Sequence, residues 1–491
     1  MNIKLSVLGF WLAALAACEG AAGWNQFRGE NGQGVSANDK PPIHLDREES
    51  LLWQIELPPG HSSPVMAGDL IFLTSFSEGK LSTLAVSKSG RRIEWKKEIP
   101  AEKIEKHHSF GSPAAPSCVT DGKRVISYFG SFGLAAYDLA GKELWQKPLP
   151  MSANHYGTAT SPVIVDGKLI LARDTDGGDS FIEAMDPASG ASLWKKSRPM
   201  NRAGWSTPVV WETEGGKQIV IAGFGRLSGY SLEGEEVWSK GGISIEHITM
   251  PVVEKGRLIL ASAAIGGGSE DRKPLPTWAE MLKSYDKNGN GKIEKEEAPK
   301  DASFVIRPQL PEKTNGRDLS LTFLFNISDR NQDDALTEEE WAGTTQFMAA
   351  SRDTVFSLRP GGKGELGDAD VAWKASRGVP EIPSPLLYQG RLYMVKNGGM
   401  LTSYNAETGQ IILDRERLGL TGQFCASPVA ANGHIYIVAE NGAIVVLKAG
   451  DTLEIVSRRL LSERVTATPA IADDCLYIRT EKRLFCFGQK P

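Results

Sequence analysis

The sequence predicts an all-β fold, an eight-bladed β-propeller that is closed by its N-terminal strand and carries a small α-helical insertion in blade five. Three observations lead to this prediction. A strand-opening proline recurs along the 491 residues, several units continue with a turn whose Gly precedes a Trp by four residues, and one interval between prolines is much longer than the rest. The 52 glycines agree with this fold, because a propeller needs many tight turns.

The proline repeat defines the blades. Motifs such as SSPVMAGDLIFL and TSPVIVDGKLIL predict a strand, a turn and a second strand. The prolines are Pro64, Pro116, Pro162, Pro208, Pro251, Pro385, Pro428 and Pro469. Apart from one interval of 134 residues, they are 41 to 52 residues apart, close to the period of a four-stranded propeller blade. Gly141, Gly190 and Gly234 each precede a Trp by four residues, which predicts a hairpin turn and then a strand whose Trp packs between neighbouring sheets.

The two ends of the chain are predicted to share blade eight. The last unit supplies only three strands, TPAIA, CLYIRT and RLFCFG, and the segment SLLWQIEL near the N-terminus is a strand without a blade. Pairing the two would complete the eighth sheet and remove two exposed sheet edges. We therefore expect the residues near Trp53 to lie beside Phe485.

The long interval holds an insertion at residues 266–351, so that the propeller consists of residues 24–265 and 352–491. Its stretch DKNGNGKIEKEE matches the twelve-residue EF-hand loop. The ligands predicted for this loop are Asp286, Asn288, Asn290, the carbonyl of Lys292, and Glu297, with Glu294 acting through water. A second loop, DRNQDDALTEEE, supplies Asp329, Asn331, Asp333, the carbonyl of Ala335, and Glu340. It departs from the pattern at Asp334, where Gly is usual.

All of these ligands are oxygen atoms, which favours Ca²⁺ over zinc or copper. The sequence thus predicts two calcium sites, with a metal-free polar turn as the alternative for each. The insertion lies between the second and third strands of blade five, a connection on the same face as the blade-to-blade connections. We expect the calcium module on the rim of the face where propellers hold ligands. Because Ca²⁺ is plentiful outside the cytoplasm, a structural role is favoured over signalling.

Five of the seven histidines fall in blade-to-blade connections on that face. His61, His107, His108, His155 and His247 lie three to nine residues before a blade-opening proline, and Trp205, Glu381 and Arg464 occupy equivalent places. Imidazoles with a carboxylate and a cation could bind an anionic ligand, a metal or a quinone. The candidate ligand-binding residues are His61, His108, His155, His247, Glu381 and Arg464. The alternative is that connecting loops collect polar residues and that His caps strand ends.

The first 23 residues predict an export signal. A positively charged start precedes the apolar run Leu5–Ala17, which is too short for an ordinary membrane span. Residues 15–18, Leu-Ala-Ala-Cys, resemble a bacterial lipobox, which would make Cys18 the lipidated first residue. Cleavage after Ala22 or Gly23 is the alternative. We expect a mature chain without a transmembrane helix, either a periplasmic or outer-membrane-anchored lipoprotein of a bacterium or, alternatively, a secreted protein.

The charge and the cysteines give two further expectations, one about the partner class and one about disulfides. The net charge is −5, from 55 basic and 60 acidic residues without a dense basic tract, so nucleic-acid binding is not expected. Cys118, Cys425, Cys475 and Cys486 form no CxxC motif. Buried free thiols are the expected state, because Cys475 and Cys486 would lie diagonally on neighbouring strands, an awkward geometry for a disulfide.

The repeats resemble the PQQ-like β-propeller family. The resemblance rests on WNQFRGENGQGVS (Trp24–Ser36), the SPV…DGKL openings and the turn YNAETGQ (Tyr404–Gln410), and it covers nearly all of the chain outside the insertion. The family includes quinoprotein dehydrogenases and non-catalytic members such as the outer-membrane assembly lipoprotein BamB. The adjacent-cysteine disulfide of members that resemble the alcohol dehydrogenases is absent from this sequence, and so is a haem-binding CxxCH motif.

The favoured interpretation is an exported calcium-binding propeller that acts as a non-catalytic protein-interaction or envelope-assembly scaffold. HExxH, GxxxxGK[ST] and GxSxG motifs are absent. We expect an envelope or secreted protein as the partner, and the central channel could hold a small ligand. The alternative is an oxidoreductase that uses pyrroloquinoline quinone (PQQ) or a related cofactor on the His-lined face.

Overall fold

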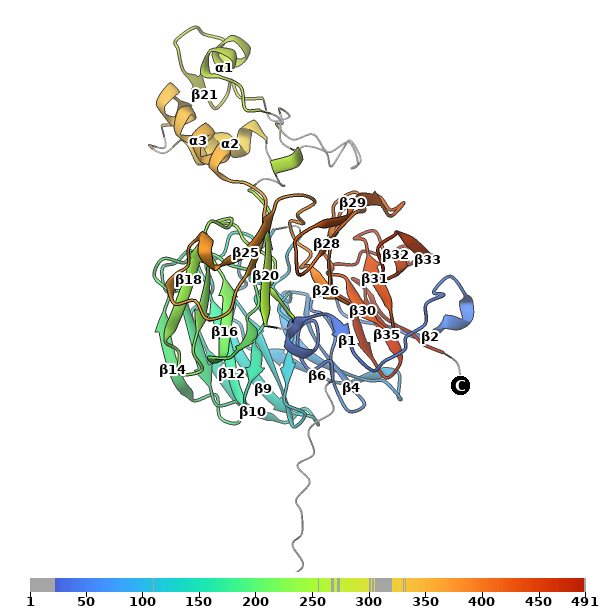
Figure 1. Cartoon of the computed structure of the whole chain (residues 1–491). Helices are drawn as coiled ribbons and strands as arrows, with labels where there is room; N and C mark the ends of the chain where they lie inside the picture. Colours follow the sequence, from blue (N-terminus) through green and yellow to red (C-terminus); the bar gives the residue numbers. More distant parts are fainter. Residues whose placement is uncertain are drawn as a thin grey trace, which may run out of the picture.

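The computed structural model describes residues 23–489 except residues 109, 255, 266–268, 272, 273, 300, 301, 303, 305–319, 330 and 332. In this part of the chain, eight antiparallel sheets surround a central axis, and three helices stand clear of them on one side (Figure 1). The predicted eight-bladed β-propeller is thereby confirmed. The predicted export signal and the lipidation site Cys18 lie outside the described residues.

Each blade has four antiparallel strands. Blades one to four are formed by β3 (Val65–Ala67), β4 (Leu70–Ser77), β5 (Lys80–Ser87) and β6 (Arg92–Ile99); β7 (Val119–Thr120), β8 (Arg124–Phe129), β9 (Gly133–Asp138) and β10 (Glu143–Pro148); β11 (Val163–Val165), β12 (Lys168–Arg173), β13 (Phe181–Met185) and β14 (Ser192–Ser197); and β15 (Val209–Thr213), β16 (Gly216–Ala222), β17 (Arg226–Tyr230) and β18 (Glu236–Gly241). Blades five to eight are formed by β19 (Val252–Glu254), β20 (Arg257–Ser262), β23 (Thr354–Leu358) and β25 (Val371–Ala375); β26 (Leu386–Tyr388), β27 (Arg391–Lys396), β28 (Met400–Asn405) and β29 (Ile411–Arg417); β30 (Val429–Ala431), β31 (His434–Val438), β32 (Ala443–Lys448) and β33 (Glu454–Leu460); and β34 (Ala470–Ala472), β35 (Cys475–Arg479), β36 (Arg483–Phe487) and β2 (Leu51–Glu56).

Blade eight joins the two ends of the chain. Strand β2 pairs antiparallel with β36, and its register places Trp53 opposite Cys486 and Gln54 opposite Phe485. The Trp53 ring also packs against Tyr477 on β35, with 6.0 Å between ring centroids. Closure by the N-terminal strand is therefore confirmed.

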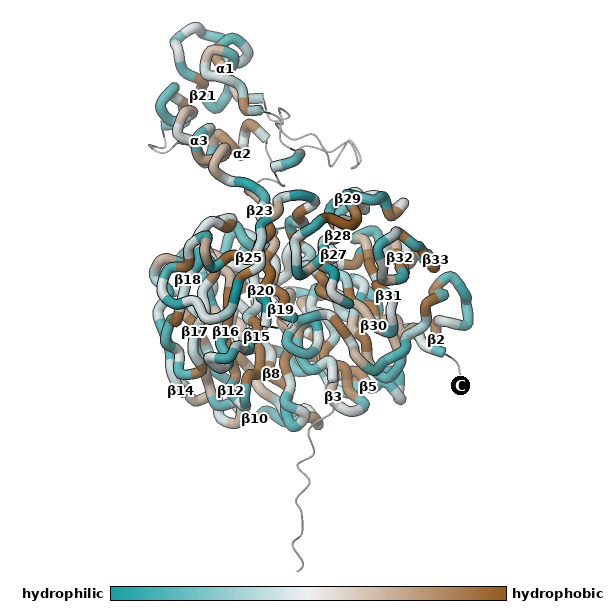
Figure 2. Tube along the Cα trace, in the orientation of Figure 1, coloured by the Kyte–Doolittle hydropathy of each residue, from teal (hydrophilic) through white to brown (hydrophobic). Residues whose placement is uncertain are grey.

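The strands nearest the axis carry the core. Residues of β8 and β9 are almost all buried, whereas the outer strand β14 alternates between exposed and half-buried positions. Figure 2 shows the same division, with brown apolar segments along inner strands such as β20 and β30. This pattern arises because inner strands are covered on both faces by neighbouring blades, while outer strands meet water.

A Trp on the outer strand of one blade packs on the next blade. The indole of Trp145 on β10 donates to the carbonyl of Pro187 in blade three at 3.0 Å, and its ring lies against Gly190. Trp95, Trp194 and Trp373 make equivalent contacts with Gly141, Gly234 and Gly409. The predicted packing of Trp between sheets is thus observed, and the glycine beneath each of these rings belongs to the following blade.

Two short strands were not predicted. Strand β1 (Val35–Ser36) lies parallel to β30, and β24 (Gly364–Glu365) lies parallel to β18. The 3-10 helices η1 (Glu30–Gly32), η2 (Glu48–Ser50) and η4 (Asp368–Asp370) lie in connecting segments. Strands β1 and β24 each extend a blade by pairing with a strand that is distant in the sequence.

The described cysteines are free thiols, as expected, but Cys425 and Cys475 are only half-buried. Cys486 on β36 lies opposite Tyr477, and Cys475 on β35 lies opposite Ala472, so the two residues are diagonal on adjacent strands, with their thiols close enough to hydrogen bond. Cys118 is fully buried.

The insertion has a core of its own. It contains η3 (Ser269–Asp271), α1 (Trp278–Tyr285), β21 (Ile293–Glu294), α2 (Leu321–Ser328), β22 (Ala335–Leu336) and α3 (Glu338–Ala350). Met281, Phe325 and Trp341 belong to its apolar cluster, separate from the clusters of the propeller. Strands β21 and β22 pair antiparallel, with Ile293 opposite Leu336. No helix in the described residues is long and apolar enough to cross a membrane.

Candidate functional site

A belt of hydroxyl groups encircles the axis where the blades begin. In seven links, the backbone N–H of one residue donates to the side-chain hydroxyl of the equivalent residue in the next blade, at 2.9 to 3.0 Å. The hydroxyls belong to Ser63, Ser117, Ser161, Thr207, Ser384, Ser427 and Thr468. Met250 holds the eighth position, which interrupts the belt. The link from Thr468 to Ser63 joins the last blade to the first.

The belt corrects one detail of the repeat. Ser117 occupies the place that Ser161 holds before Pro162, so Cys118, rather than Pro116, stands at the strand-opening position of blade two. Strand β7 accordingly begins at Val119. The proline spacing misplaced this position by two residues because blade two has Cys118 in place of the opening proline, while Pro116 lies just upstream.

The N-terminal segment 24–34 crosses the inner strands near the axis. Its backbone accepts from Met66 and Thr120, and Asn31 exchanges two hydrogen bonds with the backbone of Val210, at 2.7 and 2.8 Å. The Arg28 guanidinium is fully buried and donates to the carbonyl of Pro385 at 2.7 Å. The segment thus binds blades one, two, four and six to one another. Phe27 from this segment lines the central cavity.

The central cavity has a volume of about 800 Å³. Four of the six predicted ligand-binding residues line it, namely His61, His108, His247 and Glu381. Its lining also contains hydroxyls of the belt, such as Ser63 and Thr468. A space of this size is in the range of ligand pockets.

His155 and Arg464 are not among the lining residues. The His155 imidazole lies between two carboxylates, with Nδ1 3.0 Å from Asp176 and Nε2 3.6 Å from Glu246. Hydrogen bonding to Glu246 raises the pKa of His155 above its usual value. The Arg464 guanidinium pairs with Glu440 at 2.7 Å and lies in a separate surface pocket.

The two most enclosed imidazoles are held neutral. Burial lowers the pKa of His61 to about 3, with Arg464 and Arg479 adding to the effect. Burial also lowers the pKa of His247 to about 4. His247 is fixed by contacts of Nδ1 with the hydroxyl of Ser262 at 3.0 Å and of Nε2 with the carbonyl of Thr249 at 2.7 Å. At neutral pH neither residue gives the cavity positive charge.

An aromatic wall forms one side of the cavity. It consists of Phe110, Tyr156 and Trp205, with His108 between the first two. The rings of Tyr156 and Trp205 are 5.4 Å apart, and His108 stacks on Phe110 at 5.2 Å. The sequence had indicated only the histidines and Trp205 here. Phe110 and Tyr156 follow His108 and His155 closely in the chain, so their position was a usable signal that the histidine pattern overshadowed.

Glu246 is the other cavity residue that the sequence interpretation missed. It directly precedes His247 in the connection between blades four and five and lines the cavity beside Tyr156 and Trp205. Its position next to a predicted site residue could have identified it. In this connection the spacing pattern selected His247 and passed over the residue before it.

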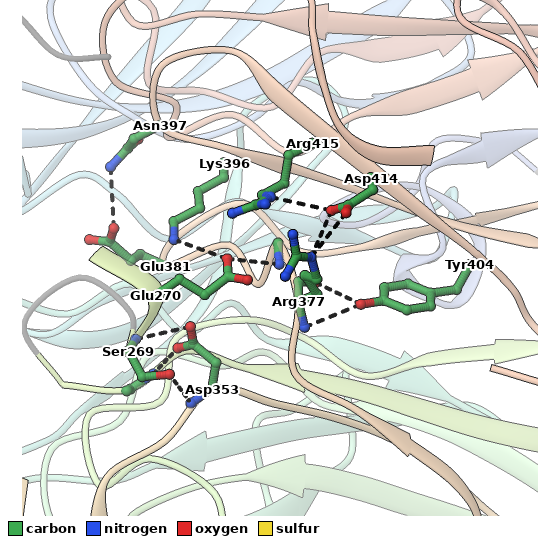
Figure 3. Close-up of polar contacts among 12 residues, drawn as sticks. Ser269, Glu270, Asp353, Arg377, Glu381, Lys396, Asn397, Tyr404, Asp414 and Arg415 are labelled. Atoms are coloured by element: carbon green, nitrogen blue, oxygen red, sulfur yellow. Dashed lines mark hydrogen bonds and ion pairs between the residues drawn. The ribbon is translucent and has the colours of Figure 1, made fainter. Parts of the chain in front are cut away.

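The residues that lead into the insertion form part of the cavity wall. After β20 the chain passes through Ala264 and Ile265, which line the cavity. Asp353, where the chain returns, accepts the N–H groups of Ala264 and Ser269 at 2.8 and 2.9 Å. Figure 3 shows this contact together with Glu270, whose carboxylate lies 3.7 Å from the Lys396 ammonium.

Blade six continues this network toward the cavity. Lys396 is buried and adjoins Asn397, and the amide of Asn397 approaches the Glu381 carboxylate at 3.5 Å (Figure 3). Glu270 also accepts the N–H of Gly378 at 3.1 Å. Asn397 and Glu381 both line the cavity, so the contact between Glu270 and Lys396 lies next to a cavity residue in the chain.

The first EF-hand-like loop, Asp286–Glu297, is folded around its own polar side chains. Asp286 accepts the N–H groups of Gly289 and Gly291, at 2.7 and 3.0 Å. The Glu297 carboxylate folds back over the loop and accepts the N–H of Lys287 at 2.8 Å. Gly291 has φ +80°, the left-handed turn required at the sixth position. The carboxylates at positions one and twelve therefore both lie over the loop backbone.

The second loop, Asp329–Glu340, has the same turn with one difference. Asp334 adopts φ +58°, so the residue in place of Gly takes the left-handed conformation. Asp329 accepts the N–H groups of Asp333 and Asp334, both at 3.1 Å. The Glu340 carboxylate, however, accepts from the backbone and hydroxyl of Thr337 in a capping box at the start of α3. It would have to turn to reach a metal in this loop.

The donor chemistry of both loops is that of a hard cation. Asn288, Asn290 and Asn331 supply neutral amide oxygens, and the remaining predicted side-chain ligands are carboxylates. In the described part of the chain, no three His, Cys, Asp or Glu side chains gather into a metal-holding group. Such a count omits amide and carbonyl oxygens, which make up much of an EF-hand site. The residues present fit Ca²⁺ through this mixed set.

Comparison with known proteins assigns the propeller to a family. The family model of the outer membrane protein assembly factor BamB matches residues 12–181 and 328–483, together more than half of the chain. The chain belongs to this BamB family. The two matched segments cover most of the blades and leave out residues 182–327, which include the first EF-hand-like loop. No curated protein matches the sequence.

Solved structures share the fold of this BamB-family chain. BamB from Moraxella catarrhalis is 13% identical with a TM-score of 0.54, and the match covers 90% of this chain and 97% of that one. Quinohemoprotein alcohol dehydrogenase from Comamonas testosteroni is 12% identical with a TM-score of 0.55, over 96% of this chain and 81% of that one. A europium-containing methanol dehydrogenase is 10% identical with a TM-score of 0.56, over 95% and 98%. At these identities the likeness is one of fold alone.

Proposed function

We propose that this BamB-family propeller is an exported, calcium-binding scaffold of the bacterial envelope that binds a partner on its cavity-bearing face without catalysing a reaction. The observation that carries the proposal is the pair of EF-hand-like loops, joined through β21 and β22, whose insertion follows directly on the wall residues Ala264 and Ile265. Membership in the family of an outer membrane protein assembly factor also supports the proposal.

Calcium would be held first in the Asp286–Glu297 loop. Asp286, Asn288, Asn290, Glu297 and the Lys292 carbonyl are its ligands in this proposal, and Glu297 already lies over the loop. The second loop would use Asp329, Asn331, Asp333, Glu340 and the Ala335 carbonyl. It should bind more weakly, because Glu340 must give up its capping contacts with Thr337. Bound Ca²⁺ would supply the cross-links that hold this small domain rigid on the rim.

The calcium assignment is tested on the full chain by calorimetric titration after chelator treatment. We expect two sites in the wild type, and loss of at least about tenfold in affinity at the tighter one in Glu297→Gln, because the residue is the bidentate twelfth ligand. Glu340→Gln should affect the weaker site only. Glu296→Gln, next to the ligand and outside the ligand positions, is the matched control. Equal titrations for Glu297→Gln and Glu296→Gln would contradict the assignment.

A second candidate function is that of an oxidoreductase. The observation that favours it is the cavity of about 800 Å³, large enough for a cofactor. PQQ, however, carries three carboxylates, and the charged side chains that the structure places in the described lining, histidines aside, are Glu246 and Glu381. These residues do not fit an anionic cofactor. Dye-linked oxidation of alcohols or sugars that depends on added PQQ and Ca²⁺ would nevertheless establish this function and overturn the non-catalytic one.

A further inference from the structure

The charge of the central cavity is distributed unevenly. In the described lining, the acidic side chains are those of Glu246 and Glu381, and neither Lys nor Arg lines it. Arg464, expected from the sequence to supply a cation, lies behind the wall, 5.9 Å from the ring of Phe110, and pairs with Glu440 at 2.7 Å. The enclosed imidazoles of His61 and His247 add no positive charge, because burial holds both pKa values far below neutrality. His155, whose pKa is raised, lies between Glu246 and Asp176, so one imidazole is shared by two carboxylates.

The carboxylate of Glu246 stands next to the aromatic wall. The imidazole of His155 lies 3.6 Å from the Glu246 carboxylate and 5.4 Å, edge-on, from the Trp205 ring. Trp205 in turn packs on Tyr156 and is fixed by a hydrogen bond from its indole to the carbonyl of Gly157 at 2.9 Å. A carboxylate and π-faces are thus offered to the same part of the cavity by side chains that are already held in place.

This combination favours positive charge. An ammonium or guanidinium group gains charge-assisted hydrogen bonds from a carboxylate and an electrostatic attraction to aromatic faces. A carboxylate or phosphate ligand would meet two acidic side chains and no described lining cation, so no ion pair with a lining residue would offset its desolvation cost.

We propose that the central cavity binds an organic cation, an ammonium or guanidinium group on an apolar body, with Glu246 as its charge partner and Tyr156 and Trp205 as its aromatic contacts. The proposal rests on the proposed function in one respect, that this face is the one that binds a partner. It goes further by naming the chemistry that is recognised.

Two sources could present this chemistry. A free amine of small-molecule size would be enclosed by a cavity of about 800 Å³, and so would a Lys or Arg side chain that enters from a partner peptide. Both would use the same contacts with Glu246 and the aromatic wall. The test therefore includes one probe of each kind.

The experiment is a calorimetric titration of the calcium-loaded full chain with three probes of similar shape: phenethylammonium, 2-phenylethanol and 3-phenylpropanoate. We expect the ammonium to bind at least about tenfold more tightly than the alcohol, a difference of about 1.4 kcal/mol, and the carboxylate to bind most weakly. Equal or tighter binding of the carboxylate would overturn the proposal, and so would failure of every probe to bind at millimolar concentration.

Variants locate the binding. Glu246→Gln should lower the ammonium affinity by about tenfold and leave the alcohol unchanged, since only the charge contact is removed. Glu416→Gln, at an exposed position of the outer strand β29, is the matched control and should leave both unchanged. Trp205→Leu should weaken the ammonium more than the alcohol because it removes a π-face. Unchanged ammonium binding in Glu246→Gln would overturn the assignment.

The source is distinguished by comparing phenethylammonium with N-acetyl-arginine amide and a short Arg-containing peptide. Tighter binding of the peptide, abolished in Glu246→Gln, supports recognition of a partner chain, and a preference for the free amine supports a small-molecule ligand. Failure of the calcium proposal is separable: a protein that binds no Ca²⁺ but discriminates ammonium from carboxylate retains this site. A protein that binds Ca²⁺ but does not discriminate ammonium from carboxylate lacks this cation site.

Discussion

Glu105 is a buried carboxyl group behind the wall of the central cavity. Its side chain is 2% exposed, and the hydroxyl of Thr158, itself a lining residue, donates to one of its oxygens at 2.7 Å. The other oxygen has no hydrogen-bond partner within the described structure. Burial raises the pKa of Glu105 from 4.5 to about 7, because the charged form is poorly solvated there.

This pKa predicts a pH-dependent stability. Between about pH 4.5 and 7 the folded protein binds more protons than the unfolded chain, so the contribution of Glu105 is fully present below pH 4.5 and is lost as the pH rises through 7. Glu105→Gln should remove this loss, so that its free energy of unfolding relative to wild type rises by up to about 3 kcal/mol between pH 5 and pH 8. Urea denaturation at both pH values measures the difference. The exposed Glu49→Gln is the control, and parallel pH profiles for Glu105→Gln and wild type would contradict the prediction.

The sequence placed single residues with uneven success. Counting back from each blade-opening proline identified a face of the propeller, and His61, His108, His247 and Glu381 do line the cavity. The same count included His155 and Arg464, which do not. Distance along a connection determines which end of the blade a residue reaches. Distance from the axis depends on how each connection folds. The side chains of His155 and Arg464 contact nearby carboxylates and do not line the cavity.

The contacts between blades depend on glycine at a particular turn. Gly190, at the turn between β13 and β14, has φ +71° and lies beneath the Trp145 ring of the preceding blade, where an added Cβ would stand 2.7 Å from ring carbon Cε3. Gly167, in the turn between β11 and β12 of the same blade, has φ +74° with open space around it. The two positions therefore separate backbone strain from loss of packing.

Gly190→Ala should lower the free energy of unfolding by about 3 kcal/mol, because it combines left-handed backbone strain with overpacking against Trp145. Gly167→Ala should cost only about 1 kcal/mol, from strain alone. Chemical denaturation of both variants checks the difference. If the two variants lost equal stability, the contact with Trp145 would not be what restricts position 190.

The strands that were predicted and those that were not differ in their physical origin. Each four-stranded blade is formed by local hairpins whose prolines, glycines and apolar runs stand close together in the chain. Strands β1 and β24 pair in parallel with β30 and β18. Each is only two residues long and pairs with a distant segment, so the local sequence carries no strand pattern. Likewise, the EF-hand-like loops follow from a compact motif, whereas the turning of Glu340 toward Thr337 is a rotamer that spacing does not specify.

Closure of the ring makes the propeller cooperative. Strand β2 completes blade eight, the hydroxyl belt passes from Thr468 to Ser63, and the segment 24–34 ties inner strands of several blades together. Ile55 on β2 packs on the apolar cluster shared by the first and last blades, while the neighbouring Gln54 is exposed on the opposite face. The two residues offer a matched test of closure.

Ile55→Asp should destabilise the protein by about 2 kcal/mol or more, because it places a charge where apolar surface is buried. We expect hydrogen exchange to accelerate together in residues 51–56 and 483–487, since both belong to the closing pair of strands. Gln54→Asp should leave the exchange of both segments nearly unchanged. Acceleration confined to residues 51–56 would show that β36 is stable without its partner.

Local order in the chain was enough to define the blades and the two oxygen-rich loops, because each depends on residues within one hairpin or one twelve-residue turn. The closing strand followed from a count, since one strand near the start and three at the end make one blade. The cavity is different. Its carboxylates, aromatic rings and neutral histidines come from separate connections between residues 61 and 381, and their orientation follows from burial beside neighbours that no spacing reveals. The chemistry that the propeller offers to a ligand therefore arises only once eight sheets have closed around one axis.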